Sequence, residues 1–501
     1  MRFCFPLVAT LLLVLVLSVS ICTSCSDEER FPSDAHGSLS FSVDTLEMDT
    51  LIAGEVSPTR RLVIRNNSND PLRIVGISFL QGKSEGFRVI VDGIRVTDTL
   101  TVPIDCRSGD SLQVFVQTLL PESGENHPVH HKAVLAFTLA NGICQQLCLS
   151  AWGQDVVTLS PLVSPSGVTL QAGKPYLVRD SLVVPFGASL TLQPGVILLF
   201  RSNAYMRIEG SLIAKGTLEA PICFRGNRMD YMFPNQPYDR ISGQWQGIII
   251  GSRCTGVDMD FCDIHSGSYG LFFEGTDASE TSPLMTIRNS IIHNMSGHGI
   301  EAHNSHLHIG NSQITNAGGN CISIYGGKHE FIHCTIGQFY PFSALSGPAL
   351  YLANSYSGTF CPLYQADFIN CIITGYSDDD IIGESIGDDD ETHPFRYRFS
   401  HCLLNTPEVV DPLFINNVWE SKEHKVMHEN NFTGFIPPSL IYGFQLDSLS
   451  SAIGIGDTLA TLRYPLDRKG KNRLSDHRSD AGCYEYSSLL LPSGSRGIRF
   501  F

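Results

Sequence analysis

The sequence is poor in charge, and basic residues are the scarcer kind. Charged residues make up 17% of the 501 residues, with 34 Lys and Arg against 50 Asp and Glu, for a net charge of −16. Nucleic-acid binding requires a basic surface, so we expect no nucleic-acid partner. Hydrophobic residues make up 43%, which indicates a packed chain, long enough for two or three domains.

Long apolar runs are also scarce. The first 25 residues, MRFCFPLVATLLLVLVLSVSICTSC, contain one run with the length of a signal-peptide core. No second run of this kind follows, which argues against a multi-span membrane protein. The amino terminus is therefore interpreted as an export signal.

The end of this run resembles a bacterial lipoprotein signal of the Bacteroidetes type. Small residues precede Cys25, and the acidic stretch SDEE follows it. The resemblance implies that residues 1–25 are the signal peptide with Cys25 as the lipidated residue, and that residues 26–36 form a tether. It further implies an outer-membrane protein, lipid-anchored and facing the cell exterior. Lipidation of Cys22, or a cleaved signal with export as a soluble protein, are the alternatives.

Residues 37–157 carry no helical pattern and alternate short apolar runs with turn residues. The runs at 60–66, 72–79, 87–93, 111–120 and 132–142 are predicted strands. The stretch LVIRNNSNDPLRIVGISF resembles bacterial immunoglobulin-like domains related to the hydin and sperm-protein modules, which implies a β-sandwich. Cys144 and Cys148 lie too far apart on one strand to form a disulfide, and we expect them to be buried.

Residues 160–486 contain a loose internal repeat. Copies of one short stretch begin at six places: Phe261, Asn289, Asn311, His333, Asn370 and His401. In each copy the second residue is Cys or Ser and the fourth is Ile or Leu. The copies are 22 residues apart at their closest, and larger separations imply insertions.

A period in the low twenties with β-type residues indicates a solenoid. The leucine lattice of leucine-rich repeats is missing, so a parallel β-helix fits better. Positions two and four of each copy should point inward and stack in columns, and the Cys positions should be buried free thiols. The Asn and His residues that begin five of the copies suit a left-handed corner before each strand.

Other stretches resemble secreted bacterial right-handed parallel β-helix proteins. They are GASLTLQPG (187–195), GSLIAKGT (210–217), WQGI (245–248) and the closing DAGCYEY (480–486). The fold class expected is therefore all-β: a right-handed parallel β-helix of the pectate-lyase-like type, preceded by an immunoglobulin-like β-sandwich. The apolar residues 487–501 are expected to form a cap or tail.

Chemistry-bearing motifs are few. No EF-hand spacing, nucleotide loop or Ser-His-Asp pattern occurs. The run 376–393 is dense in carboxylates, so calcium is a possible ligand there or the run is a solvated acidic loop. Outward-facing His306 and His308 could bind a transition metal. The candidate calcium ligands are Asp378, Asp379, Asp380, Asp388, Asp389 and Asp390.

Four aromatic residues between 339 and 360 could stack on sugar rings or simply pack this insertion onto the solenoid: Tyr340, Phe342, Tyr351 and Tyr356. We expect a cell-surface lipoprotein that binds a polysaccharide or a surface protein, with no identified catalytic residue. A polysaccharide lyase or glycoside hydrolase acting through residues 340–395, or a structural spacer or adhesin, are the alternatives.

Overall fold

The computed structural model describes residues 31, 36–80, 83–97, 99–101, 103–275, 284–387, 391–420 and 431–488. Within these residues the regular secondary structure is almost entirely strand, as predicted, and no helix is long and apolar enough to cross a membrane. The chain divides into two compact units, and the second is continuous from Gly153 onward.

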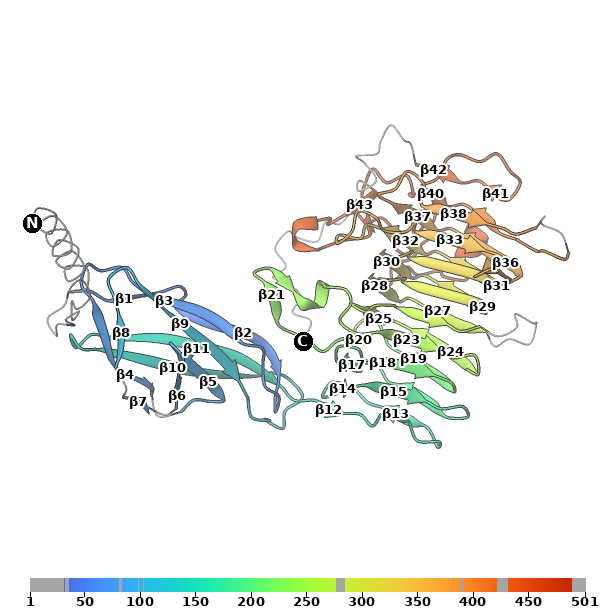
Figure 1. The fold of residues 1–501 in the computed structure, drawn as a ribbon. Coiled ribbons are helices and arrows are strands. Elements are labelled where there is room, and N and C mark those ends of the chain that lie inside the picture. Colours follow the sequence, from blue (N-terminus) through green and yellow to red (C-terminus); the bar gives the residue numbers. More distant parts are fainter. Residues whose placement is uncertain are drawn as a thin grey trace, which may run out of the picture. The chain divides into compact units, whose positions relative to one another are not determined.

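The first unit contains two antiparallel sheets (Figure 1). One sheet has the order β1 (Leu39–Phe41), β3 (Arg60–Asn66), β9 (Ser111–Thr118), β5 (Phe87–Val91) and β6 (Ile94–Val96). The other has the order β2 (Thr45–Ile52), β11 (Cys144–Gln154), β10 (Val129–Leu139), β4 (Leu72–Phe79) and β7 (Thr99–Leu100), with β8 (Ile104–Cys106) also paired to β4.

Alternating side chains bury one face of these strands. The predicted strands at 60–66 and 72–79 are confirmed to the residue. The expectation that Cys144 and Cys148 are buried is wrong, because both are exposed on β11. Leu147 and Leu149 take the inward positions of that strand, so the side chains of alternate parity point to solvent.

The second unit is a parallel β-helix in which each coil contributes strands to three faces (Figure 1). Face 3 is a single parallel sheet. Its strands are β12 (Val157–Thr158), β14 (Tyr176–Val178), β17 (Ile197–Phe200), β20 (Ile222–Gly226), β25 (Cys262–His265), β28 (Ile291–Met295), β30 (Gln313–Ala317), β32 (Thr335–Gln338), β37 (Ile372–Gly375), β40 (Leu403–Leu404) and β42 (Val418–Trp419).

Faces 1 and 2 are joined by two long strands, β29 (Ile300–Gly310) and β31 (Ile322–Ile332), that run through both. Face 1 also contains β15 (Ser181–Val184), β18 (Tyr205–Ile208), β23 (Gly247–Ile250), β26 (Leu271–Phe273), β33 (Leu350–Ala353) and β38 (Ile381–Glu384). Face 2 also contains β13 (Val168–Leu170), β16 (Ser189–Leu192), β19 (Ser211–Lys215), β24 (Gly256–Asp260), β27 (Met285–Arg288), β36 (Leu363–Ile369), β39 (Arg398–Ser400) and β41 (Phe414–Ile415).

The sequence repeat is the coil of this helix. The predicted aliphatic column is confirmed, because its members pair in register from coil to coil and are all buried. They are Ile264, Ile292, Ile314, Ile336, Ile373 and Leu404. Phenylalanine rings form another inner stack, in which Phe331, Phe368 and Phe399 lie 4.7 and 5.0 Å apart with nearly parallel planes. Burial of such columns is the main stabilising contribution of a solenoid core.

A left-handed corner lies one or two residues before each of the six face-3 strands from β25 to β40, also as predicted. The φ angles lie between 47° and 54° at Phe261, Asn289, Asn311, His333, Asn370 and His401. Asn tolerates this region better than most residues. The Asn311 amide further donates to the Asn289 side-chain oxygen (2.6 Å), and the Asn370 amide bonds the His333 ring (3.0 Å), so these corners are hydrogen-bonded in pairs.

The inward Ser and Cys column satisfies backbone groups at the same corner. The Ser312 hydroxyl accepts from the Ser290 backbone N–H (3.1 Å) and donates to the Gly310 carbonyl (2.8 Å). The Cys402 thiol plays the same part for the Cys371 N–H at 3.4 Å. The repeated Cys residues are buried free thiols, in agreement with the sequence-based expectation. Ser and Cys alternate at this position because the side chain of either residue can accept from the backbone N–H of the preceding coil.

A C-terminal segment, residues 431–486, packs along the outside of face 3. Phe432 of β43 (Phe432–Thr433) and Leu446 of β44 (Gln445–Leu446) join a buried cluster with Phe339 and Leu403. The short helix α2 (Thr458–Thr461) begins with Asp457, whose carboxylate accepts from the Ala460 N–H (2.9 Å). Residues 489–501 of the expected cap lie outside the described residues.

This segment is also bonded to the coils by polar contacts. The Glu330 carboxylate of β31 accepts from Arg463 (2.6 and 2.8 Å) and from His308 (2.8 Å). The bonds with His308 and then Arg463 lower the pKa of Glu330 to about 2. His308 also bonds the Tyr464 hydroxyl (2.7 Å), so its two ring nitrogens serve the attachment of this segment.

The corner column predicts that Ser312→Ala destabilises the protein by about 1–3 kcal/mol, because the buried Ser290 N–H loses its acceptor. Ser312→Cys should be nearly neutral, since Cys occupies this position in neighbouring coils. Thermal melting monitored by circular dichroism measures both variants. Equal destabilisation by the two substitutions would contradict the role assigned to the column.

The lowered pKa of Glu330 predicts a pH-dependent contribution to stability. A carboxyl with a folded pKa of about 2 and a higher unfolded pKa stabilises the fold fully above its unfolded value and loses that stabilisation as the pH falls. Glu330→Gln should therefore lower the melting temperature near about pH 7 and have a much smaller effect near about pH 2. Glu408→Gln, at an exposed carboxylate, is the control. A difference independent of pH would count against this contribution.

Candidate functional site

The outer surface of face 1 carries a cluster of aromatic rings, here called the aromatic platform. Parallel register places His303 of β29 beside Tyr325 of β31, and Tyr351 of β33 on the neighbouring outward column. Tyr356 comes from the hairpin of β34 (Ser355–Tyr356) and β35 (Thr359–Phe360), and Phe272 comes from β26. Rings that are up to 84 residues apart in sequence, from Phe272 to Tyr356, thus meet because successive coils stack.

The rings of the platform are in mutual contact. His303 stacks on Tyr325 with centroids 4.8 Å apart, and its edge meets Tyr356 at 4.4 Å. Tyr325 also contacts Tyr356 at 4.8 Å and Tyr351 at 5.7 Å. Phe272 lies 5.5 Å from His303. Contacts of this length restrict ring motion and hold the surface in one shape before any ligand arrives.

Carboxylates border the platform. The Glu301 Oε1 lies 2.9 Å from His303 Nε2, and Glu384 accepts from the Tyr351 hydroxyl at 2.7 Å. Burial, followed by the bond with Glu384, raises the pKa of Tyr351, and burial raises the pKa of Tyr325. Both hydroxyl groups therefore stay neutral at physiological pH; that of Tyr351 donates to Glu384 and keeps its lone pairs as acceptors.

A charged group continues the same face on lower coils. Arg207 of β18 donates to both oxygens of Glu274 (2.9 and 2.7 Å) and to Glu209 (2.7 Å). The bond with Glu274 raises the pKa of Arg207. Arg253 also bonds Glu209 (3.3 Å), so the two arginines neutralise the two glutamates, which favours a structural role over recognition of an ionic ligand.

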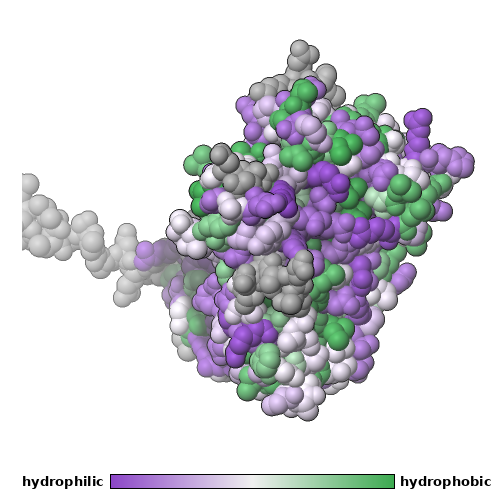
Figure 2. Space-filling view, turned by 90° about the vertical axis from the view of Figure 1, so that its right-hand side faces the viewer, coloured by the Kyte–Doolittle hydropathy of each residue, from purple (hydrophilic) through white to green (hydrophobic). Residues whose placement is uncertain are grey.

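Face 2 presents charges that are likewise paired. Asp258 bonds Arg288 (3.0 Å) and Asp367 bonds Arg398 (3.0 Å). Figure 2, which turns the right-hand side of Figure 1 to the viewer, shows hydrophilic residues interspersed with hydrophobic ones over this side. Face 1, with its partly exposed rings, is the better candidate for a ligand surface.

The four aromatic residues singled out from the sequence fall into two groups. Tyr351 and Tyr356 belong to the platform, and the Tyr356 side chain is 44% exposed. Tyr340 is instead buried, shares a 2.8 Å hydrogen bond with Ser242, and packs on Phe342 at 5.5 Å. Phe272 and Tyr325 were missed, because nothing in the sequence marks which coils carry an outward ring at the same column.

The candidate calcium ligands are spread over different environments. Asp380 is buried and accepts from the Asn405 amide at 2.7 Å. Asp379 accepts from the Ile381 N–H (3.2 Å), and Asp378 is exposed. Asp388, Asp389 and Asp390 lie outside the described residues. Calcium binding in this run stays a prediction.

The two platform carboxylates, Glu301 and Glu384, start from backbone positions three coils apart. Ile382 is in register with Glu301 three coils away, and Glu384 lies two residues beyond Ile382. With the usual strand spacings, the Cα atoms of Glu301 and Glu384 are about 16 Å apart. A retaining or inverting pair requires carboxyl groups about 5–9.5 Å apart. By the same register Glu274 is nearer to Glu301, but both of its oxygens accept from Arg207.

Comparison with known proteins supports the fold. The family model described as "Right handed beta helix region" matches residues 199–336, which lie within the solenoid. The second unit is a right-handed parallel β-helix, as the sequence predicts. No curated protein matches the chain.

Solved structures give distant similarities only. A protein of unknown function from Porphyromonas gingivalis W83 aligns at 13% identity over 25% of this chain and 51% of its own length, with a TM-score of 0.18. A family 123 glycoside hydrolase from Clostridium perfringens aligns at 9% identity over 25% of this chain and 26% of its own, with a TM-score of 0.18. This chain thus spans about half and about a quarter of those two proteins.

The catalytic unit of the GH87 alpha-1,3-glucanase from Streptomyces thermodiastaticus strain HF3-3 aligns more extensively. It matches at 11% identity over 72% of this chain and 75% of its own length, with a TM-score of 0.26. Similarities this low carry no activity across to this chain.

Proposed function

We propose that this protein binds a glycan on the aromatic platform of face 1. The observation that carries the proposal is the set of contacting rings, His303, Tyr325, Tyr351 and Tyr356, bordered by two carboxylates. A sugar ring has an apolar face of C–H groups and a rim of hydroxyls. Aromatic faces match the first, and carboxylate and phenol oxygens match the second.

The shape of face 1 favours an extended chain over a single sugar. The platform runs across the coils of β26, β29, β31, β33 and β38, which are about 4.8 Å apart, so it is about 19 Å long. That length accommodates several sugar residues in a row, each contacting a different coil. Glycan binding therefore requires many modest contacts along the surface, which suits a surface capture function.

The rival function is that of a polysaccharide lyase or glycoside hydrolase acting through residues 340–395. Residues 340–395 supply Tyr351, Tyr356 and Glu384 to the platform, and the two platform carboxylates, Glu301 and Glu384, stand about 16 Å apart at their Cα atoms. A structural spacer or adhesin that binds no glycan is the further alternative. The experiment below separates the three.

The cellular setting is part of the proposal. The stretch before Cys25 supports a lipid anchor at that residue in the outer membrane, with the chain facing the cell exterior. The two antiparallel sheets of the first unit are compatible with an immunoglobulin-like domain between the anchor and the β-helix. Such an arrangement would present face 1 to polysaccharides or to surface proteins outside the cell.

The platform predicts that Tyr325→Ala and Tyr356→Ala each weaken binding to a glycan-array hit about tenfold, because a lost stacking contact of about 1.4 kcal/mol corresponds to that ratio. Phe342→Ala, at an exposed ring outside the platform, is the matched control and should leave the affinity unchanged. The full chain in detergent is screened first, and each hit is then assayed for new reducing ends and unsaturated products.

Three results decide the matter. Binding without cleavage that depends on Tyr325 and Tyr356 supports glycan capture. Cleavage would establish the enzymatic alternative. An array with no hit, or binding that survives both substitutions, would contradict the platform as the ligand surface.

The lipid anchor predicts that Cys25→Ser abolishes incorporation of labelled fatty acid and releases the protein from the membrane fraction. Cys22→Ser is the matched control and should leave both unchanged. Loss of labelling in the Cys22 variant alone would move the anchor to that residue, and labelling of neither wild-type nor variant protein would refute lipidation.

A further inference from the structure

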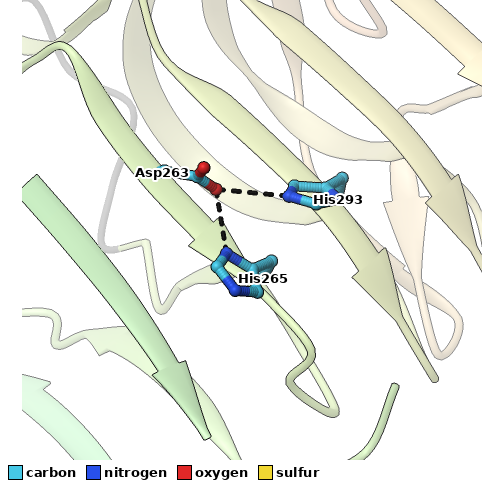
Figure 3. A group of neighbouring side chains, drawn as sticks. All are labelled: Asp263, His265 and His293. Atoms are coloured by element: carbon cyan, nitrogen blue, oxygen red, sulfur yellow. Dashed lines mark hydrogen bonds and ion pairs between the residues drawn. The ribbon is translucent and has the colours of Figure 1, made fainter. Parts of the chain in front are cut away.

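A second cluster of side chains lies on the outer surface of face 3. Asp263 and His265 are two residues apart on β25 and therefore point the same way, and His293 of β28 pairs with His265 in parallel register. Figure 3 shows the three side chains converging. Among the described residues they form the group of ligating atoms that all lie within 4.8 Å of one another.

The distances suit the coordination sphere of a small divalent ion. Asp263 Oδ1 lies 2.9 Å from His265 Nδ1 and 3.2 Å from His293 Nε2. Ligands about 2.0–2.1 Å from a tetrahedral zinc ion are about 3.3 Å from one another. An ion at the centre of this group thus requires movements of only a few tenths of an ångström along these two edges.

A second carboxylate orients His265 from the other side. Asp239, in the short helical turn η2 (Tyr238–Arg240), lies 2.7 Å from His265 Nε2 through its Oδ1 and is itself held by Arg225 at 2.8 Å. The Trp245 indole donates to the His265 carbonyl at 2.9 Å. A carboxylate on the remote nitrogen of a metal-binding histidine fixes the ring and increases its basicity, which is the usual arrangement in metalloproteins.

Access and chemistry agree with this arrangement. The Asp263 and His293 side chains are 24% and 26% exposed, whereas that of His265 is 7% exposed. An ion can therefore enter from solvent and keep a water in the remaining position. Asp239 occupies His265 Nε2, so Nδ1 is the ring nitrogen that faces Asp263 and is free to bind the ion.

We propose that Asp263, His265 and His293 bind a divalent transition-metal ion, with Zn²⁺ as the best match to two imidazoles and one carboxylate. Asp239 is the positioning residue of the site. The ion joins β25 to β28 and, through Asp239, to the turn at 238–240. This site is independent of the glycan-binding surface on face 1.

The test is a zinc titration of the full-length, untagged protein in detergent after removal of metals by a chelator. About one equivalent should bind with a dissociation constant in the range of about 10⁻⁶ M or tighter and should raise the melting temperature. His293→Gln should weaken binding at least about 100-fold, and Asp239→Asn about 10-fold. Cobalt should give a spectrum without thiolate charge-transfer bands, which separates this site from the free cysteines.

His127→Gln is the matched control, since it alters a largely exposed histidine outside the cluster and should leave the titration unchanged. Circular dichroism of the metal-free His293→Gln variant checks that it folds, and its partly exposed side chain makes folding the expected result. Absence of zinc binding by the wild-type protein, a thiolate cobalt spectrum, or equal affinity in the folded His293→Gln variant would each overturn the proposal.

Discussion

Backbone hydrogen bonding between successive coils is the constraint on which the rest of this structure depends. Every strand of the β-helix uses the next coil as its partner, so each coil must present the same backbone path at a spacing of about 4.8 Å. Equivalent side chains of successive coils therefore stack on one another, which produces the aliphatic, phenylalanine and Ser/Cys columns. The corner column shows it most directly, since the Ser312 hydroxyl satisfies an N–H of the preceding coil.

Because the inward side chains must pack the core, residue types vary between coils mainly at the outward positions. The outward residues differ among the three faces. Face 1 collects aromatic rings and carboxylates, face 2 presents charges that neutralise one another, and face 3 is partly covered by residues 431–486. Buried Arg473 of that segment bonds Glu485 (2.7 Å) and Asn311 (2.5 Å), so its attachment uses polar contacts as well as apolar ones. The platform and the proposed metal site thus lie on faces with different neighbours.

Stacking also explains how distant residues come to share a site. His303 and Tyr325 are one coil apart in sequence and contact each other directly, and Tyr356 is added by a hairpin inserted after β33. Asp239 reaches His265 because a loop between two coils folds back on the outside of face 3. A solenoid therefore needs few residues per coil to build a ligand surface, and insertions of any length can contribute.

The sequence alone determined the solenoid and its inward order. The 22-residue period, the aliphatic fourth position and the Asn or His at the corner depend on local backbone geometry and on the alternation of side chains along a strand. Both can be predicted from the residues of one coil. The first-unit strands at 60–66 and 72–79 followed from alternation in the same way. Parity failed at Cys144 and Cys148, where the inward places belong to Leu147 and Leu149, since alternation cannot say which face is the buried one.

Only the tertiary structure decided which outward residues meet. Tyr351 and Tyr356 join His303 and Tyr325, while Tyr340 and Phe342 pack elsewhere, because insertions of unequal length leave the coil at different corners. The convergence of Asp263, His265 and His293 depends on the register of two coils, and the contribution of Asp239 depends on a loop path. Neither is encoded by local pattern, because the distance between outward side chains is set by which coil stacks on which.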